Sequence, residues 1–263
     1  MTRMHDAGPV LVFDSGLGGL SVVRAISQQI PRIRLVYVAD DAAFPYGDWE
    51  DDQLRTHIVE LMGRLIAQYR PTAVVIACNT ASTLVLPALR ARYEIPFVGT
   101  VPAIKPAAEQ TKTGIIAVLA TPGTMRRDYT RDLIRKFASL VHVRLVGAPL
   151  LAAFAEARMR GEGIDERALA EQIEPCFVEV EGRRTDMVVL ACTHYPFLAD
   201  LFDRHAPWPV CFIDPAPAIA RRLASVLDGR RGDEGSGTAA FTSGRPVPAP
   251  VLQILQQYRL AGG

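Results

Sequence analysis

The amino-acid sequence predicts an α/β protein made of two related halves, each built on a parallel sheet. Short apolar segments rich in valine and isoleucine alternate along the chain with stretches of helical character. Apolar strands that alternate with helices are typical of parallel sheets covered on both faces. In addition, Thr72–Thr80 resembles Asp186–His194, because each has the pattern of a buried strand that ends in Ala-Cys before small polar residues. A repeated segment of this kind indicates two related halves.

The expected elements follow from the same patterns. We expect strands at 10–13, 34–38, 73–77, 97–99, 115–119, 141–146, 187–191 and 210–213. We expect helices at roughly 19–30, 51–69, 81–93, 102–110, 123–138, 150–160, 165–181, 197–205, 215–228 and 250–260. Residues 229–250 are rich in glycine, serine and proline, which favours a loop with a short strand near Ala239–Thr242.

Composition excludes several classes of protein. The 263 residues suffice for two domains, and the formal net charge of +1 gives no electrostatic reason to expect nucleic acid or an acidic membrane as partner. We expect a cytoplasmic location, because the N-terminus lacks the apolar core of a signal peptide and no run has the length of a membrane span. The cysteines are Cys78, Cys176, Cys192 and Cys211, and their wide spacing predicts neither structural disulfides nor a metal site.

Four residues whose side chains could take part in catalysis or ligand binding stand where expected strands end. They are Asp14, Cys78, Thr121 and Cys192. In open parallel sheets, ligands bind at the carboxyl ends of the strands. If the two halves face each other, one cleft receives all four side chains, and we expect the active site there.

Two thiols suit the removal of a proton from one face of a carbon and the delivery of a proton to the other face. A cysteine has a reference pKa of about 8.5, so thiolate and thiol are both accessible near neutral pH. Asp14 can orient one thiol and His194 the other. Hydroxyl and amide groups that can hold a carboxylate or an ammonium lie beside them in the sequence, at Ser15, Asn79, Thr80, Ser82 and Thr193.

Several blocks of the sequence resemble the signature blocks of glutamate racemases, within the aspartate/glutamate racemase superfamily. The most specific are the Cys-Asn-Thr block in Ala77–Ser82 and the Cys-Thr-His block in Ala191–Pro196. The others are Asp14–Ser21, Pro45–Asp48, Gly99–Ala107 and Phe241–Gly244. Ala191 departs from the pattern, since the family usually has glycine before the second cysteine, and the extra methyl group affects packing more than activity.

The resemblance implies the interconversion of L- and D-glutamate without a cofactor, which supplies D-glutamate for bacterial peptidoglycan and so for the cell wall. It implies two flavodoxin-like domains, 1–98 plus 208–263 and 99–207, with a small-molecule site in the cleft between them, and it fits a monomer or a homodimer. Cys78 would act on D-glutamate and Cys192 on L-glutamate, with Asp14 and His194 assisting. The matched residues that would bind substrate or tune the thiols are Asp14, Ser15, Tyr46, Gly47, Asn79, Thr80, Thr121, Thr193 and His194.

Other functions remain open on the sequence alone. The nearest is a racemase for another amino acid, such as aspartate, or a related decarboxylase. A cysteine nucleophile paired with histidine is a second, although the phosphate-binding C-x5-R version fails because Leu84 and Leu198 stand where arginine is needed. A pyridoxal-phosphate enzyme would need a lysine such as Lys105, which we place on the surface. A binding module for small acids is the non-catalytic alternative, in which Asp14 and Ser15 would only cap a helix.

Overall fold

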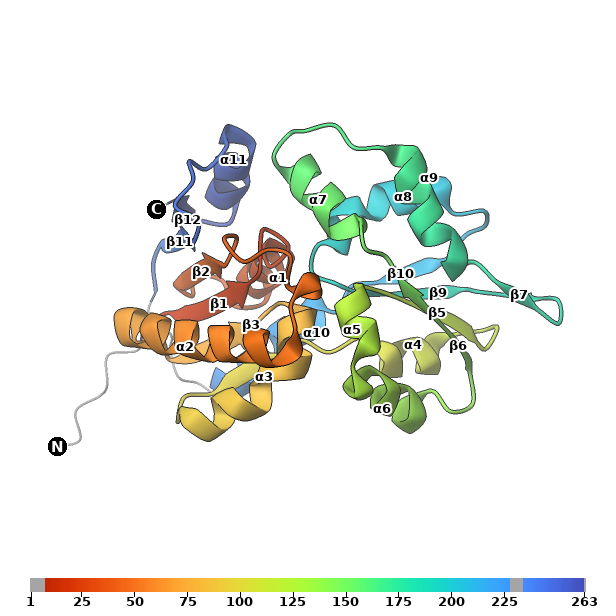
Figure 1. Cartoon of the computed structure of the whole chain (residues 1–263), viewed down its shortest axis with the longest axis horizontal. Coiled ribbons are helices and arrows are strands. Elements are labelled where there is room, and N and C mark those ends of the chain that lie inside the picture. The colour runs from red at the N-terminus through yellow and green to blue at the C-terminus, as the bar shows by residue number, and fades with distance from the viewer. Residues whose placement is uncertain (1–7, 228–233, 263) are drawn as a thin grey trace. The chain divides into compact units, whose positions relative to one another are not determined.

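This computed structural model describes residues 8–227 and 234–262, which form two α/β units (Figure 1). One unit comprises the described residues of Met1–Thr100 and Ala216–Gly263, and the other comprises Val101–Pro215. The predicted fold class is confirmed, because each unit is built on a parallel sheet with helices around it. The predicted domain boundaries at 98/99 and 207/208 stay predictions.

The sheet of the first unit has six strands in the order β12-β11-β2-β1-β3-β4. Every neighbouring pair in it is parallel. The strands are β1 (Val10–Asp14), β2 (Leu35–Ala39), β3 (Ala73–Ile76), β4 (Phe97–Gly99), β11 (Gly237–Phe241) and β12 (Leu260–Gly262). The last two come from the end of the chain, so the chain returns to the first unit after completing the second.

The sheet of the second unit has four parallel strands in the order β10-β9-β5-β6. They are β5 (Ile115–Ala120), β6 (His142–Gly147), β9 (Met187–Ala191) and β10 (Cys211–Ile213). Numbered within its unit, this sheet has the order 2-1-3-4, and so do β1 to β4 of the first unit, which is the flavodoxin-like order. Strand β1 therefore corresponds to β5, and β3 corresponds to β9, as the repeated segments predicted.

Helices complete each unit. The first unit contains α1 (Leu20–Gln29), α2 (Asp51–Tyr69), α3 (Asn79–Arg92), α10 (Ala216–Leu227), α11 (Ala249–Gln257) and the 3-10 turn η1 (Tyr46–Asp48). The second contains α4 (Ile104–Gln110), α5 (Pro122–Arg126), α6 (Asp128–Phe137), α7 (Leu151–Met159), α8 (Glu166–Ile173), α9 (Ala199–His205) and the 3-10 turns η2 (Glu174–Cys176) and η3 (Tyr195–Leu198). The strands β7 (Glu179–Val180) and β8 (Arg183–Arg184) form a separate two-stranded antiparallel ribbon.

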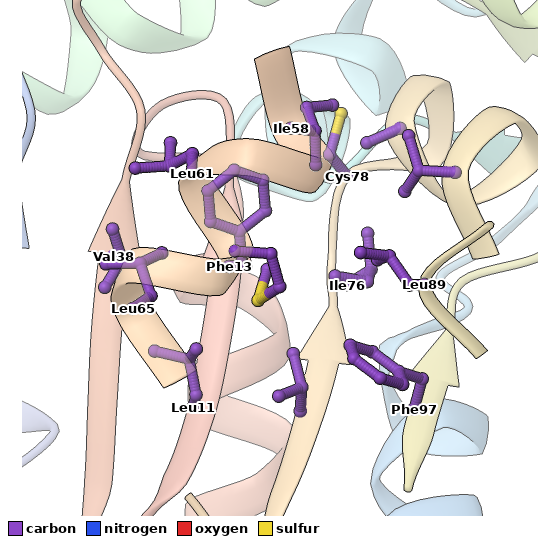
Figure 2. Close-up of a cluster of buried hydrophobic side chains, with 14 of the residues drawn as sticks. Leu11, Phe13, Val38, Ile58, Leu61, Leu65, Ile76, Cys78, Leu89 and Phe97 are labelled. Carbon is purple, nitrogen blue, oxygen red and sulfur yellow. The ribbon is translucent and has the colours of Figure 1, made fainter. Parts of the chain in front are cut away.

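The core of the first unit fixes the position of one candidate thiol. Strand side chains such as Phe13 and Ile76 pack against α2 side chains such as Ile58, and Cys78 belongs to the same buried cluster. Figure 2 shows Cys78 at one end of this cluster, beyond the end of β3 and beside Ile58. Burial of such side chains contributes about 1.5–3 kcal/mol each, so the strand that leads to Cys78 is firmly held.

Some predicted elements were wrong in extent. The helix expected at 165–181 ends at Ile173, because Pro175 lacks the N–H that a continuing helix needs, and a turn and β7 follow. The helix expected at 123–138 is two helices that meet at Arg127, where the Thr124 carbonyl accepts from the Arg127 N–H over 3.4 Å and from the Thr130 hydroxyl over 3.0 Å.

Near the end of the chain, the helix expected at 250–260 stops at Gln257, and Leu260 already belongs to β12. Part of the predicted loop, residues 229–233, lies outside the described residues. In residues 8–227 and 234–262, no helix has the length and apolar character needed to cross a bilayer.

Candidate functional site

Each unit brings two of the predicted residues to the ends of neighbouring strands. Asp14 is the last residue of β1, and Cys78 follows β3, which pairs with β1. Thr121 follows β5, and Cys192 follows β9, which pairs with β5. In both sheets this is the point where the strand order reverses direction, and ligands bind at such points in open α/β sheets. Each unit therefore offers one thiol at its own ligand-binding edge.

Asp14 is fully buried and anchors the loop that follows β1. Its Oδ2 atom accepts hydrogen bonds from the backbone N–H groups of Gly19 at 2.9 Å and Gly16 at 3.4 Å. A Cβ atom at position 19 would lie only 2.6 Å from the Asp14 Cβ atom, so glycine is required there. The glycine-rich block thus holds the Asp14 carboxylate in one place.

Cys78 is buried, with 6% exposure, and occupies the N-cap position of the 14-residue helix α3. The Ser15 hydroxyl donates to the Cys78 Sγ atom over 3.7 Å, so the ends of β1 and β3 meet as predicted. The positive end of a helix dipole stabilises negative charge, which favours the thiolate form of a cysteine in this position.

Asn79 follows Cys78 and is 2% exposed. Within the described part of the chain, neither its side-chain oxygen nor its side-chain nitrogen has a hydrogen-bond partner. Buried polar groups in proteins are nearly always paired, so a buried amide of this kind is available to a ligand. Thr80 is also buried, in the first turn of the same helix.

Tyr46 and Gly47 lie in η1, close in sequence to the end of β2. The buried Tyr46 hydroxyl donates to Asp40 Oδ2 over 2.6 Å. Burial, and then the nearby Asp40 carboxylate, raise the pKa of Tyr46 well above its ordinary value, so its phenol stays neutral. A Cβ atom at Gly47 would meet nothing within 4 Å, so packing does not explain the glycine.

Cys192 lies at the end of a series of polar contacts in the second unit, which runs through His194 and Glu156. Its Sγ atom is 3.7 Å from His194 Nδ1, and His194 Nε2 is 2.8 Å from Glu156 Oε1. Glu156 also pairs with Arg160 over 3.1 Å. Burial alone would lower the pKa of His194, but its hydrogen bonds to Cys192 and Glu156 outweigh burial and raise that pKa well above its usual value. A buried imidazolium therefore stands next to the sulfur.

The remaining predicted residues are also near strand ends. The Thr121 Oγ1 atom accepts from the Thr124 N–H over 3.3 Å, so Thr121 caps α5. Thr193 is buried between Cys192 and His194. Cys176 lies in η2, where burial raises the pKa of its thiol to about 12, so this thiol stays protonated and unreactive.

Sequence reasoning missed Asp40 and Glu156. Asp40 directly follows β2, so the rule that placed Asp14 at a strand end would also have found it. Glu156 lies inside helix α7, where an acidic residue carries no signal in the sequence. In the described residues, no cluster of three or more histidine, cysteine, aspartate or glutamate side chains could hold a metal ion.

Comparison with known proteins gives consistent results. Residues 12–223 match the Asp/Glu/Hydantoin racemase family. Glutamate racemase from Brucella anthropi is 66% identical over 257 residues, which cover 96% of this chain and 92% of that protein. Glutamate racemase from Brucella canis is 60% identical over the same length and shares of each chain.

Solved structures are similar over almost the whole chain. Escherichia coli glutamate racemase, in complex with L-glutamate and the activator UDP-MurNAc-Ala, has a TM-score of 0.88 and 36% identity, covering 97% of each chain. A glutamate racemase isoform from Bacillus anthracis has a TM-score of 0.81 and 26% identity, covering 98% of this chain and 97% of that one.

Proposed function

Because the chain belongs to the Asp/Glu/Hydantoin racemase family, we propose that it is a glutamate racemase that moves protons between substrate and two thiols. One observation carries the proposal: Cys78 and Cys192 follow β3 and β9, which occupy equivalent places in two sheets of the same strand order. Two equivalent thiols suit a reaction on opposite faces of one carbon, because one can remove a proton while the other delivers one.

In the proposed reaction, the thiolate of one cysteine removes the α-proton of glutamate. The C–H bond breaks, an S–H bond forms, and the electron pair stays on the α-carbon. The thiol of the other cysteine then gives its proton to the opposite face, which inverts the configuration and leaves a new thiolate. By the family resemblance, Cys78 removes the proton from D-glutamate and Cys192 removes it from L-glutamate.

In the first unit, the surroundings of Cys78 support this role. The N-terminus of α3 favours the thiolate, and the Ser15 hydroxyl can donate to it. The unpaired buried amide of Asn79 is suited to a carboxylate or ammonium group of the substrate. Asp14 and Thr80 complete the proposed substrate contacts of this edge, together with the turn that contains Gly47.

In the second unit, His194 is the proposed partner of Cys192. An imidazolium 3.7 Å from the sulfur can stabilise a thiolate, or give the sulfur a proton when the substrate leaves. Glu156 keeps the imidazole charged and oriented through its 2.8 Å contact. Thr121 and Thr193 are the proposed hydroxyl donors to the substrate at this edge. The same resemblance supports a cytoplasmic enzyme that supplies D-glutamate for peptidoglycan.

The test is the decay of the circular dichroism of L-glutamate and, separately, of L-aspartate, with purified protein and no added cofactor. We expect the glutamate signal alone to decay to zero, and Cys78→Ala and Cys192→Ala each to slow the decay by about 100-fold or more. Cys211→Ala is the matched control, since this thiol is exposed at the start of β10. Decay of aspartate alone would change the substrate, and full activity in either active-site variant would refute the two-thiol mechanism.

Two further measurements sharpen the result. The assay is repeated with UDP-MurNAc-Ala, which the Escherichia coli structure contains as activator. Activity that appears only in this second run indicates an enzyme that needs the activator, whereas no activity in either run indicates that the protein is not a racemase. In D2O, Cys78→Ala should still exchange the α-proton of L-glutamate but not that of D-glutamate, and Cys192→Ala should show the reverse. Light scattering on the same sample distinguishes a monomer from a homodimer.

A further inference from the structure

Asp40 is a buried carboxylate that gathers three side chains from separate parts of the first unit. It directly follows β2 and is 1% exposed. Its Oδ2 atom accepts from the Tyr46 hydroxyl at 2.6 Å and is 2.6 Å from His57 Nε2, while its Oδ1 atom accepts from the Thr242 hydroxyl at 2.7 Å. An ionised carboxylate only accepts hydrogen bonds, so His57 donates through Nε2.

Thr242 brings the Phe241–Gly244 block, which has no assigned role so far, into the same cluster. The Thr242 Oγ1 atom also accepts from the Ala42 N–H over 3.2 Å. The next residue, Ser243, donates through its N–H and its hydroxyl to the Asp41 carboxylate, over 2.9 Å and 2.5 Å. The end of β11 is therefore tied to the segment that follows β2 by several hydrogen bonds.

The same segment leads directly into the turn that carries Tyr46 and Gly47. This turn is only three residues long and has no side-chain cap of its own. Beyond Tyr46, the Trp49 ring lies against the His57 ring at an angle of 31°, with ring centroids 5.2 Å apart, and Trp49 donates to the Ala43 carbonyl over 3.0 Å. A short uncapped turn takes its position from such contacts, because its own backbone hydrogen bonds are few.

We propose that Asp40, His57 and Thr242 are positioning residues that hold the Tyr46–Gly47 turn in the conformation that binds substrate. The inference rests on the proposed function, in which this turn contacts glutamate. Loss of one donor leaves part of the buried carboxylate unpaired and loosens the turn. The hydrogen bonds of this cluster lead to the turn, and proton transfer at the two thiols requires none of its groups. The Michaelis constant for glutamate therefore rises, while kcat changes little.

The test uses pairs of variants in the full-length protein. Thr242→Val and His57→Leu remove a donor at nearly constant size, whereas Thr242→Ser and His57→Gln keep one. We expect a KM for glutamate about tenfold higher in the first pair, with KM moving back toward the wild-type value in the second pair. His205→Leu is the matched control, because His205 makes a similar 3.2 Å pair with Glu166, exposed in the other unit.

Melting temperature and its rise on adding D-glutamate are measured for every variant, so that binding is read without turnover. A weaker rise in Thr242→Val and His57→Leu, in protein that still folds, supports the inference. Unchanged KM in these variants, an equal fall in kcat, or the same defect in the conservative pair would overturn it while leaving the racemase function intact. Wild-type protein that neither turns over nor binds glutamate would overturn the proposed function and this inference with it.

Discussion

The buried pair of His194 and Glu156 makes the stability of the protein depend on pH in a defined direction. The change to test is Glu156→Gln, which removes the negative charge but keeps an oxygen that can accept from His194 Nε2. Both side chains are buried, with exposures of 2% and 7%. Two unit charges about 4 Å apart attract by roughly 4 kcal/mol at an effective dielectric constant of about 20. Desolvation of the carboxylate offsets part of this attraction, so we expect a net loss of about 2 kcal/mol.

The sign of the pH effect follows from the raised pKa of His194, which arises from its hydrogen bonds to Cys192 and Glu156 against the opposing effect of burial. A histidine whose folded pKa exceeds its unfolded value of about 6.5 stabilises the fold fully below that value. The stabilisation is lost as pH rises through the folded pKa. The free energy of unfolding of the wild type should therefore fall as pH rises above the unfolded value of about 6.5 and through the raised folded pKa, and the variant should show a smaller fall.

The assay is urea unfolding followed by far-ultraviolet circular dichroism across this pH range. Glu166→Gln is the control, because Glu166 pairs with His205 at 3.2 Å on the exposed surface, where such pairs are worth less than about 1 kcal/mol. The reasoning would be refuted by equal losses in the two variants. A difference between wild type and Glu156→Gln that grows toward high pH would refute it too.

Two further changes test the strand ends and the unused thiols. Gly19→Ala should lower the free energy of unfolding by about 1–3 kcal/mol and also lower activity, because the new Cβ atom would approach the Asp14 Cβ atom to 2.6 Å. Gly47→Ala is the control, since a Cβ atom there meets nothing within 4 Å, and its melting temperature should be close to that of the wild type. Equal melting temperatures of the two variants would contradict the argument. Iodoacetamide at about pH 8 should label the exposed Cys211 and spare Cys176, whose pKa is raised to about 12 by burial, as mass spectrometry of the native protein can check.

The fold could be predicted because it depends on patterns that the sequence states directly. The strands that end at Asp14 and Ala191 contain the continuous apolar runs 10–13 and 187–191, and the repeated Ala-Cys segments correctly identified β3 and β9 as equivalent. Where the predicted extent of a helix was wrong, either a local sequence signal was overlooked or a tertiary contact determined where the helix ends. Pro175 ends a helix that hydrophobic periodicity alone would continue, whereas Arg127 divides a helix where the sequence gives no breaker.

The candidate site was predictable only in part, for a related reason. Residues at the ends of strands are brought together by topology, so Ser15 and Cys78 could be paired from the sequence. Contacts between residues distant in the chain follow no short pattern. Glu156 reaches His194 from a helix, and Thr242 reaches Asp40 from a segment 202 residues away.

The return of the chain to the first unit also protects that unit from self-association. Without β11, strand β2 would end the sheet with a row of free N–H and C=O groups on five buried, apolar residues, Leu35–Ala39. Long apolar edges of this kind pair with other chains and promote aggregation. Strand β12 takes the outer place instead, and it is only three residues long, with alanine and glycine as its last two residues. The last strands of the sheet thus replace a long apolar edge strand, which could pair with other chains, by a short edge strand that pairs weakly.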